Sequence, residues 1–210
     1  MGSLSRVRAL IASAGDEHKG AFLRRVDRLF PTTDHRHLNI MKAYEIAKAA
    51  FRSKFRDDGV ERYFEHLRFV ALIVIDILRV RDPDVIVAAL LHDIVEDIPE
   101  WTFERVRLEF GVRVAGLVWW VTKPPAEEYA SKAERDRSYH RRFDRAPREA
   151  VLIKLADRLH NLCTLWSVEE KKRSRKISET EDFYLSLAER EICLIHEIEE
   201  ALAELRQAPC

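Results

Sequence analysis

An apolar run ends in four polar residues, which are His92, Asp93, Glu96 and Asp97. Asp82-Pro83 is a typical helix start. A helix continuing from there through all four residues would place the two later acids one turn beyond the His-Asp pair. Burying four such groups is costly unless a partner satisfies them. The stretch therefore indicates either a divalent-cation site or a solvated helix end.

Two further polar residues interrupt apolar helical patterns, namely His66 and Asp157. Each has an ordinary explanation alone, since a single helical His is usually a satisfied or surface residue and Asp157 stands beside Arg158. With His92 and Asp93 they provide two imidazoles and two carboxylates on three helices. This donor set suits Mn²⁺, Fe²⁺ or Mg²⁺ better than a metal that prefers thiolates. Four such ligands would leave two octahedral positions for water and a substrate oxygen.

The composition favours a helical chain with a sizeable core. The 210 residues are 47% hydrophobic and include only 6 Gly and 7 Pro. No segment shows convincing strand alternation, so the predicted fold is all-α, a single helical bundle. Residues 1–38 are predicted to be an N-terminal helical extension, and residues 39–205 the main domain. Helices are expected at about 39–55, 61–80, 82–97, 101–110, 111–121, 147–165 and 179–205.

The charge is balanced, with 36 basic and 36 acidic residues. The chain as a whole has no electrostatic preference for nucleic acid or membrane, so neither partner is expected. Three scattered cysteines without a CxxC pair fit a reducing cytoplasm. No signal peptide is visible, and the apolar runs are too short to span a bilayer. These features predict a cytoplasmic protein.

A basic segment at 132–148 contains seven basic residues against three acidic ones. It precedes the predicted helix of Asp157 and could fold over a cleft, where arginines such as Arg141 would contact phosphate. The alternative is a solvated helix face. That alternative is favoured for a second basic run at 171–176.

Several motifs together carry a family resemblance. His66, His92-Asp93 and Asp157 resemble the metal-binding pattern of the HD-domain phosphohydrolases. The segments 90–97, 110–123 and 154–162 are similar to the hydrolase domain of the stringent-response alarmone enzymes, which make and degrade guanosine tetra- and pentaphosphate. The resemblance covers about residues 39–190. It leaves no residues for a synthetase domain, which favours the stand-alone small alarmone hydrolase type and allows a homo-oligomer.

The resemblance implies roles for individual residues. His66, His92, Asp93 and Asp157 match the metal ligands, with Mn²⁺ as the expected ion, and Glu96 and Asp97 match the acidic pair that acts on the attacking water. Predicted substrate contacts are Arg56, Asn161, Thr164, Lys154 and Arg141. The implied reaction removes the 3′-diphosphate from guanosine tetra- or pentaphosphate. Independently of any resemblance, a divalent ion can activate water and neutralise phosphate oxygens, and a nearby carboxylate can take the proton.

Some positions depart from the family pattern. Asp57 stands where a basic residue is usual, Arg62 and Leu67 replace two prolines around the first ligand, and Cys163 replaces an arginine. These changes touch the nucleotide pocket rather than the metal site. Alternative functions are therefore hydrolysis of NADPH or another nucleotide, and a non-catalytic nucleotide-binding regulator. A DNA-binding helical protein is disfavoured by the neutral charge.

Overall fold

The computed structural model describes residues 2–56 and 59–207, apart from the side chains of residues 14–18 and 167. Within these residues the chain is helical, and one isolated antiparallel bridge between Phe55 and Arg62 is the closest approach to a strand. The all-α prediction is confirmed. No helix in this part of the chain is both long and apolar enough to cross a bilayer.

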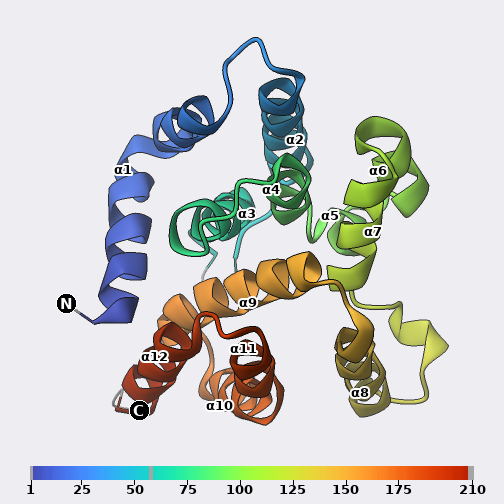
Figure 1. Ribbon diagram of the computed structural model, residues 1–210. Helices are drawn as coiled ribbons and strands as arrows, with labels where there is room; N and C mark the ends of the chain where they lie inside the picture. The colour runs from blue at the N-terminus through green and yellow to red at the C-terminus, as the bar shows by residue number, and fades with distance from the viewer. Residues whose placement is uncertain (1, 57–58, 208–210) are drawn as a thin grey trace.

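Most of the helices follow one another with short connections, and a longer one joins α2 to α3 (Figure 1). Their bounds are α1 Ser3–Leu29, α2 His35–Ala50, α3 Tyr63–Leu72, the π-helix η1 Ile73–Ile77, α4 Pro83–Leu90, α5 Ile94–Asp97, α6 Phe103–Phe110, α7 Val112–Val121, η2 Ala126–Glu128, α8 Lys132–Arg142, η3 Phe143–Arg145, α9 Arg148–Cys163, η4 Leu165–Ser167, α10 Glu170–Glu179, the π-helix η5 Thr180–Tyr184, α11 Leu185–Glu191 and α12 Ile195–Gln207.

Helix α9 crosses the middle of the molecule (Figure 1) and is buried on nearly every side. It packs against α3, α4 and α7 on one side and against α11 and α12 on the other. A helix in this position is expected to be apolar all round. The buried charged residues Lys154, Asp157 and Arg158 are therefore exceptions. Each must be satisfied inside the protein, and their partners define the site described below.

Helix α1 packs along α12 and reaches α2 and α3. Its side chains Val7, Phe22 and Val26 are fully buried in the same core as those of the other helices. Asp34 caps α2 by accepting a hydrogen bond from the Arg36 N–H group, so α2 begins before the boundary expected at residue 39. The division into an extension and a main domain stays a prediction.

The helix expected to run unbroken through the His-Asp pair is wrong. Helix α4 ends at Leu90, and a turn separates it from α5. The His92 Nδ1–H group donates to the Ala89 carbonyl over 2.8 Å. In a continuous helix that carbonyl would accept from the Asp93 N–H group. The imidazole therefore takes an acceptor that the helix needs, and the turn projects both residues toward α9.

The single long helix expected from 179 to 205 is also wrong. The chain forms η5 and α11, turns at Ile192 and Leu194, and continues as α12. Both turn residues have left-handed backbone angles, with φ of 52° and 57°. The turn allows α12 to pack against both α1 and α9. Likewise the helix expected at 61–80 widens into the π-helix η1, where the Leu78 N–H group bonds the Ile73 carbonyl over 3.0 Å.

Candidate active site

Three elements bring the predicted metal ligands together. His66 lies on α3, His92 and Asp93 in the turn after α4, and Asp157 on α9. One donor atom from each of His66, His92 and Asp157 lies within 4.8 Å of the others. The His66 Nε2 atom is 3.2 Å from Asp157 Oδ1. Asp93 completes the group, with its Oδ2 3.1 Å from His92 Nε2 and 3.8 Å from His66 Nε2.

The imidazole of His92 shows that this group fits a metal ion. The side chain is fully buried, and its Nε2 atom meets the Asp93 carboxylate at 3.1 Å without the directed geometry of a hydrogen bond. Its Nδ1–H group is already engaged by the Ala89 carbonyl. A histidine held in this way presents the Nε2 lone pair to a metal. Two imidazoles and two carboxylates are a donor set that divalent manganese, iron or magnesium accepts.

Burial and neighbouring charges shift the pKa values of the ionisable residues at this site in different directions. Burial acts to lower the pKa of His92, but the carboxylate of Asp93 outweighs it and raises that pKa to about 9. Burial and the nearby Arg56 lower the pKa of His66 to about 4. The pKa of Asp157 lies well below its ordinary value because Lys154 and His66 outweigh the opposing effect of burial. The carboxylates are thus ionised, and a proton on His92 supplies positive charge where a cation would bind.

This arrangement predicts that metal affinity depends on pH. Below pH 9 a metal must displace the proton of His92, whereas His66 is already neutral above pH 4. The association constant for Mn²⁺ should therefore rise about tenfold per unit from pH 6 to 8 and level off above pH 9. Calorimetric titration in two buffers of different ionisation enthalpy measures the released proton. A constant affinity over this range would show that His92 does not exchange a proton for the metal.

Neighbouring polar groups hold the carboxylates in place. The Tyr63 hydroxyl donates to Asp93 Oδ2 over 2.7 Å. The Asn161 side-chain amide donates to Asp157 Oδ1 over 2.5 Å, and the Lys154 ammonium lies 2.8 Å from Asp157 Oδ2. Lys154, predicted as a substrate contact, is buried and already paired with a candidate metal ligand. Its contact with substrate stays a prediction.

His160 was missed by the sequence reasoning and is buried beside His66. The two Nδ1 atoms lie 2.9 Å apart, and the His160 ring stacks on Phe69 with centroids 5.2 Å apart. Burial, followed by His66, lowers the pKa of His160 well below its ordinary value. A neutral His160 can accept a hydrogen bond from the His66 Nδ1–H group and so direct the His66 Nε2 lone pair toward the metal site. The spacing of His160 three residues after Asp157 was the available signal.

Replacing His160 with Phe should weaken metal binding. The substitution keeps an aromatic ring against Phe69 but removes the acceptor for the His66 Nδ1–H group. We expect affinity for Mn²⁺ to fall about 10- to 100-fold, the usual effect of removing such a partner. Metal titration followed by a thermal melt separates this effect from unfolding. Unchanged affinity in a folded variant would show that His160 does not orient the ligand.

The acidic pair lies on α5 and its two members point to different partners. The Lys123 backbone N–H group donates to Glu96 Oε2 over 3.1 Å. Asp97 Oδ1 lies 3.2 Å from the Lys54 ammonium, which also donates to the Asp97 carbonyl. Desolvation and the charge of Asp93 raise the pKa of Glu96, although the residue retains solvent exposure. A carboxylate with a raised pKa next to a metal site is suited to accept a proton.

The predicted nucleotide contacts meet beside the metal ligands. The Arg56 guanidinium donates to Asn161 Oδ1 over 2.9 Å and to Thr164 Oγ1 over 3.0 Å. Asn161 in turn holds Asp157, so the same amide joins Arg56 to the metal set. The neighbouring Asp57 lies outside the described residues. These contacts form one continuous polar surface from the loop before α3 to α9.

Side chains of the basic segment at 132–148 lie in two different environments. Arg141 is exposed on α8, and its side chain forms no hydrogen bond or ion pair with any residue that the structure describes, so its role stays a prediction. His140, by contrast, lies 3.4 Å from a carboxylate oxygen of Glu179. Glu179 also pairs with Arg158 over 2.9 Å, and the Lys123 ammonium lies 3.8 Å away. Sequence reasoning missed this inward-facing cluster because its members are far apart in the chain.

Comparison with known proteins supports the interpretation of the metal site. The model of the HD domain family matches residues 43–192. The chain belongs to the HD-domain family. The candidate metal ligands His66, His92, Asp93 and Asp157 fall within the matched range.

The two curated relatives described here are both named as hydrolases. A guanosine-3′,5′-bis(diphosphate) 3′-pyrophosphohydrolase of Aquifex aeolicus is 41% identical over 152 residues, covering 72% of this chain and 21% of the relative. The bifunctional (p)ppGpp synthase/hydrolase SpoT of Escherichia coli K12 is 37% identical over 169 residues, covering 79% and 23%. The HD-domain chain thus spans about a fifth of the length of these curated relatives.

A solved structure extends the comparison over almost a whole protein. It is a metazoan ortholog of SpoT, described as hydrolyzing ppGpp and playing a role in starvation responses. It matches the present HD domain with a TM-score of 0.72 and 28% identity, covering 83% of this chain and 97% of the other.

Proposed function

We propose that this HD domain is a metal-dependent hydrolase that removes the 3′-diphosphate of guanosine tetra- or pentaphosphate, releasing pyrophosphate and GDP or GTP. The observation that carries the proposal is the buried His92 Nε2 atom, which lies 3.1 Å from Asp93 Oδ2 and 3.8 Å from Asp157 Oδ1 while the Nδ1–H group is held by the Ala89 carbonyl. The relatives that hydrolyse such nucleotides support the choice of substrate. Free thiols at Cys163 and Cys193 support a cytoplasmic location, while Cys210 lies outside the described residues.

We assign the proposed metal ligands to His66, His92, Asp93 and Asp157, with Mn²⁺ as the ion. When bound there, the ion would act as a Lewis acid and lower the pKa of water. Glu96 takes the proton of the attacking water, and its main-chain contact to Lys123 fixes the carboxylate. Asp97, held by Lys54, orients the same water. The negative charge that develops on the phosphate is met by the ammonium groups of Lys123 and Lys154.

Arg56, Asn161 and Thr164 hold the nucleoside part in this proposal. Their mutual hydrogen bonds preorganise one edge of the pocket, and Asn161 links that edge to Asp157. Preorganised contacts fix the substrate so that its 3′-diphosphate lies over the metal site. Arg141 is the proposed contact to the outer phosphates, reached from α8 when substrate is bound.

The test is product identification with the manganese-loaded protein. Guanosine tetraphosphate, NADPH and simple nucleotides are incubated separately, and the released group is identified. The proposal expects GDP and pyrophosphate from the tetraphosphate. Release of orthophosphate from NADPH with no action on the tetraphosphate would assign the site to the 2′-phosphate of NADPH. Absence of turnover with every compound, together with tight nucleotide binding, would identify a regulator.

Replacing Arg56 with Ala should impair binding more than chemistry. The variant loses two hydrogen bonds that hold Asn161 and Thr164, while all four candidate metal ligands are retained. We expect KM for guanosine tetraphosphate to rise about tenfold or more with kcat within threefold of the wild type. Arg52→Ala is the control, since Arg52 is exposed on the same loop. A fall in kcat at constant KM would place Arg56 in the chemical step.

A further inference from the structure

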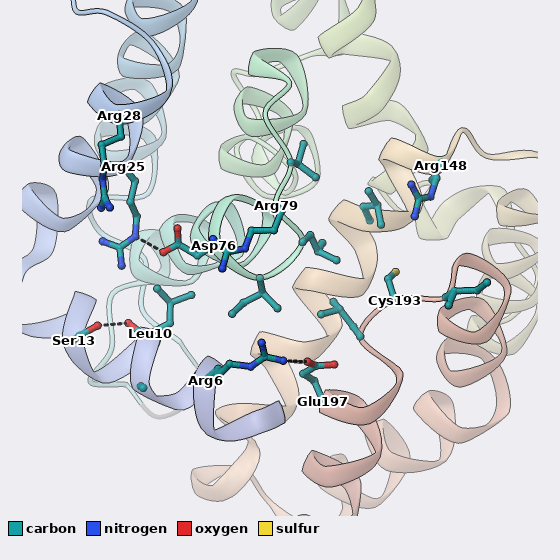
Figure 2. Close-up of a pocket in the computed structure, with 17 residues that line it drawn as sticks. Arg6, Leu10, Ser13, Arg25, Arg28, Asp76, Arg79, Arg148, Cys193 and Glu197 are labelled. Atoms are coloured by element: carbon teal, nitrogen blue, oxygen red, sulfur yellow. Dashed lines mark hydrogen bonds and ion pairs between the residues drawn. The ribbon is translucent and has the colours of Figure 1, made fainter. Parts of the chain in front are cut away.

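A large cavity lies apart from the metal site, between α1, the end of η1, the start of α9 and the turn that joins α11 to α12 (Figure 2). Its volume is about 1020 Å³, which is the size of a small-molecule pocket. No candidate metal ligand and neither member of the acidic pair lines it. Five arginines define this arginine pocket, namely Arg6, Arg25, Arg28, Arg79 and Arg148.

The arginine pocket has a strong local excess of positive charge. Its five guanidinium groups face only two carboxylates, those of Asp76 and Glu197, although the whole chain has a net charge of zero. Arg25 pairs with Asp76, and Arg6 lies 3.8 Å from Glu197. Both carboxylates are thus already engaged. Arg148 lies 3.3 Å from a carboxylate oxygen of Glu191, next to the lining. The two arginines that remain, Arg28 and Arg79, can bind an anion from solution.

Two of the arginines are available for such an anion. Arg28 donates from Nε to the carbonyl of its own helix, which leaves its two terminal amino groups without a partner among the described residues. Arg79 makes no hydrogen bond or ion pair with any residue that the structure describes. In Figure 2 the Arg79 side chain extends toward the Asp76–Arg25 pair. Guanidinium groups bind phosphate in a bidentate manner, and two or more around one cavity favour a phosphorylated ligand.

The backbone around the arginine pocket is strained. Arg79, Ile192 and Leu194 have φ of 57°, 52° and 57°, and they are the non-glycine residues with positive φ in the described part of the chain. All three line this one cavity. The left-handed region is unfavourable for residues with a Cβ atom and is rare for a β-branched residue such as isoleucine. Strain of this kind concentrates at binding sites, where function maintains it.

We propose that the arginine pocket binds a phosphorylated small molecule of nucleotide size, at a site separate from the metal centre. Arg28 and Arg79 bind the phosphate groups. Leu10, Leu78 and Leu152 line the same cavity and pack against the organic part. The site shares α9 with Asp157, and η1 directly continues the helix of His66, yet the binding itself requires neither residue.

The experiment measures binding of ADP and of inorganic pyrophosphate to the metal-loaded protein by calorimetry. The test variant is Arg28→Ala/Arg79→Gly. Glycine removes the guanidinium and also relieves the left-handed backbone at residue 79, so this variant should melt no lower than the wild type. The control is Arg105→Ala/Arg107→Ala, which removes the same charge from exposed positions on α6 outside the cavity.

We expect at least one probe to bind the wild type and the control equally. The dissociation constant should rise at least about tenfold for each guanidinium removed in the test variant. Stronger binding of ADP than of pyrophosphate identifies a nucleotide-type ligand, and the reverse identifies a free polyphosphate. Failure of both probes to bind at millimolar concentration overturns the proposal. Binding that the test variant leaves unchanged overturns it as well, since the probe then occupies another site.

Discussion

Asp157→Ala is expected to lose both bound metal and activity. Asp157 Oδ1 lies 3.2 Å from His66 Nε2, 3.8 Å from His92 Nε2 and within 2.5 Å of the Asn161 amide, so its carboxylate is central to the site. Removing a ligand from the proposed metal centre forfeits several kcal/mol of transition-state stabilisation, and turnover should fall by about 10³-fold or more. Metal content by elemental analysis and kcat are measured on the same preparation.

Two further variants distinguish the loss of a metal ligand from unfolding of the protein. The alanine leaves the buried Lys154 ammonium unpaired, which is destabilising. Asp157→Asn keeps the shape of the side chain and loses only its charge, so it should also lose metal while folding better. Glu149→Ala on the same helix should behave as the wild type, since within the described residues Glu149 pairs only with the exposed Arg113. An Asp157→Ala protein that retains a full equivalent of tightly bound metal would contradict the ligand assignment.

Glu96→Gln is expected to separate chemistry from metal binding. Glutamine preserves the shape and one acceptor oxygen for the Lys123 N–H group, but it cannot take a proton. Activity should fall by about 10²- to 10⁴-fold, the usual contribution of a positioned acid–base group. Metal content and most of the substrate affinity should remain. This combination is the signature of a group that acts on water rather than on the ion.

Two other outcomes would change the assignment. If Glu96→Gln loses metal in step with activity, Glu96 is a ligand or positions one. If neither falls, Asp97 becomes the better candidate, and Asp97→Asn should then show the loss. The two side chains have different partners, Lys123 for Glu96 and Lys54 for Asp97, so each can be replaced without removing the contact of the other.

The sequence predicted which residues gather at the site better than it predicted their local backbone geometry. His66, His92 and Asp157 could be recognised because polar residues on apolar helices must be satisfied, and the structure places them together. The break after Leu90 could not be read from periodicity, because it depends on the His92 side chain competing for the Ala89 carbonyl. The turn at Ile192 could not be predicted either, because isoleucine gives no signal for a left-handed backbone conformation.

Contacts between residues that are far apart in the chain could not be predicted from the sequence either. His160 was visible in the motif, but its contact with His66 depends on how α3 and α9 pack. Glu179 gathers Lys123, His140 and Arg158 from different helices, and no spacing in the chain indicates this. The arginine pocket is likewise assembled from arginines on α1, in the segment after η1 and on α9.

Anomalous diffraction at the manganese absorption edge tests the central claim most directly. Crystals of the manganese-loaded protein should show one strong peak among the imidazoles of His66 and His92 and the carboxylates of Asp93 and Asp157. The donor atoms already lie close enough to converge on a single ion. A peak at another place in the molecule, or no peak in protein that hydrolyses the tetraphosphate, would contradict the account.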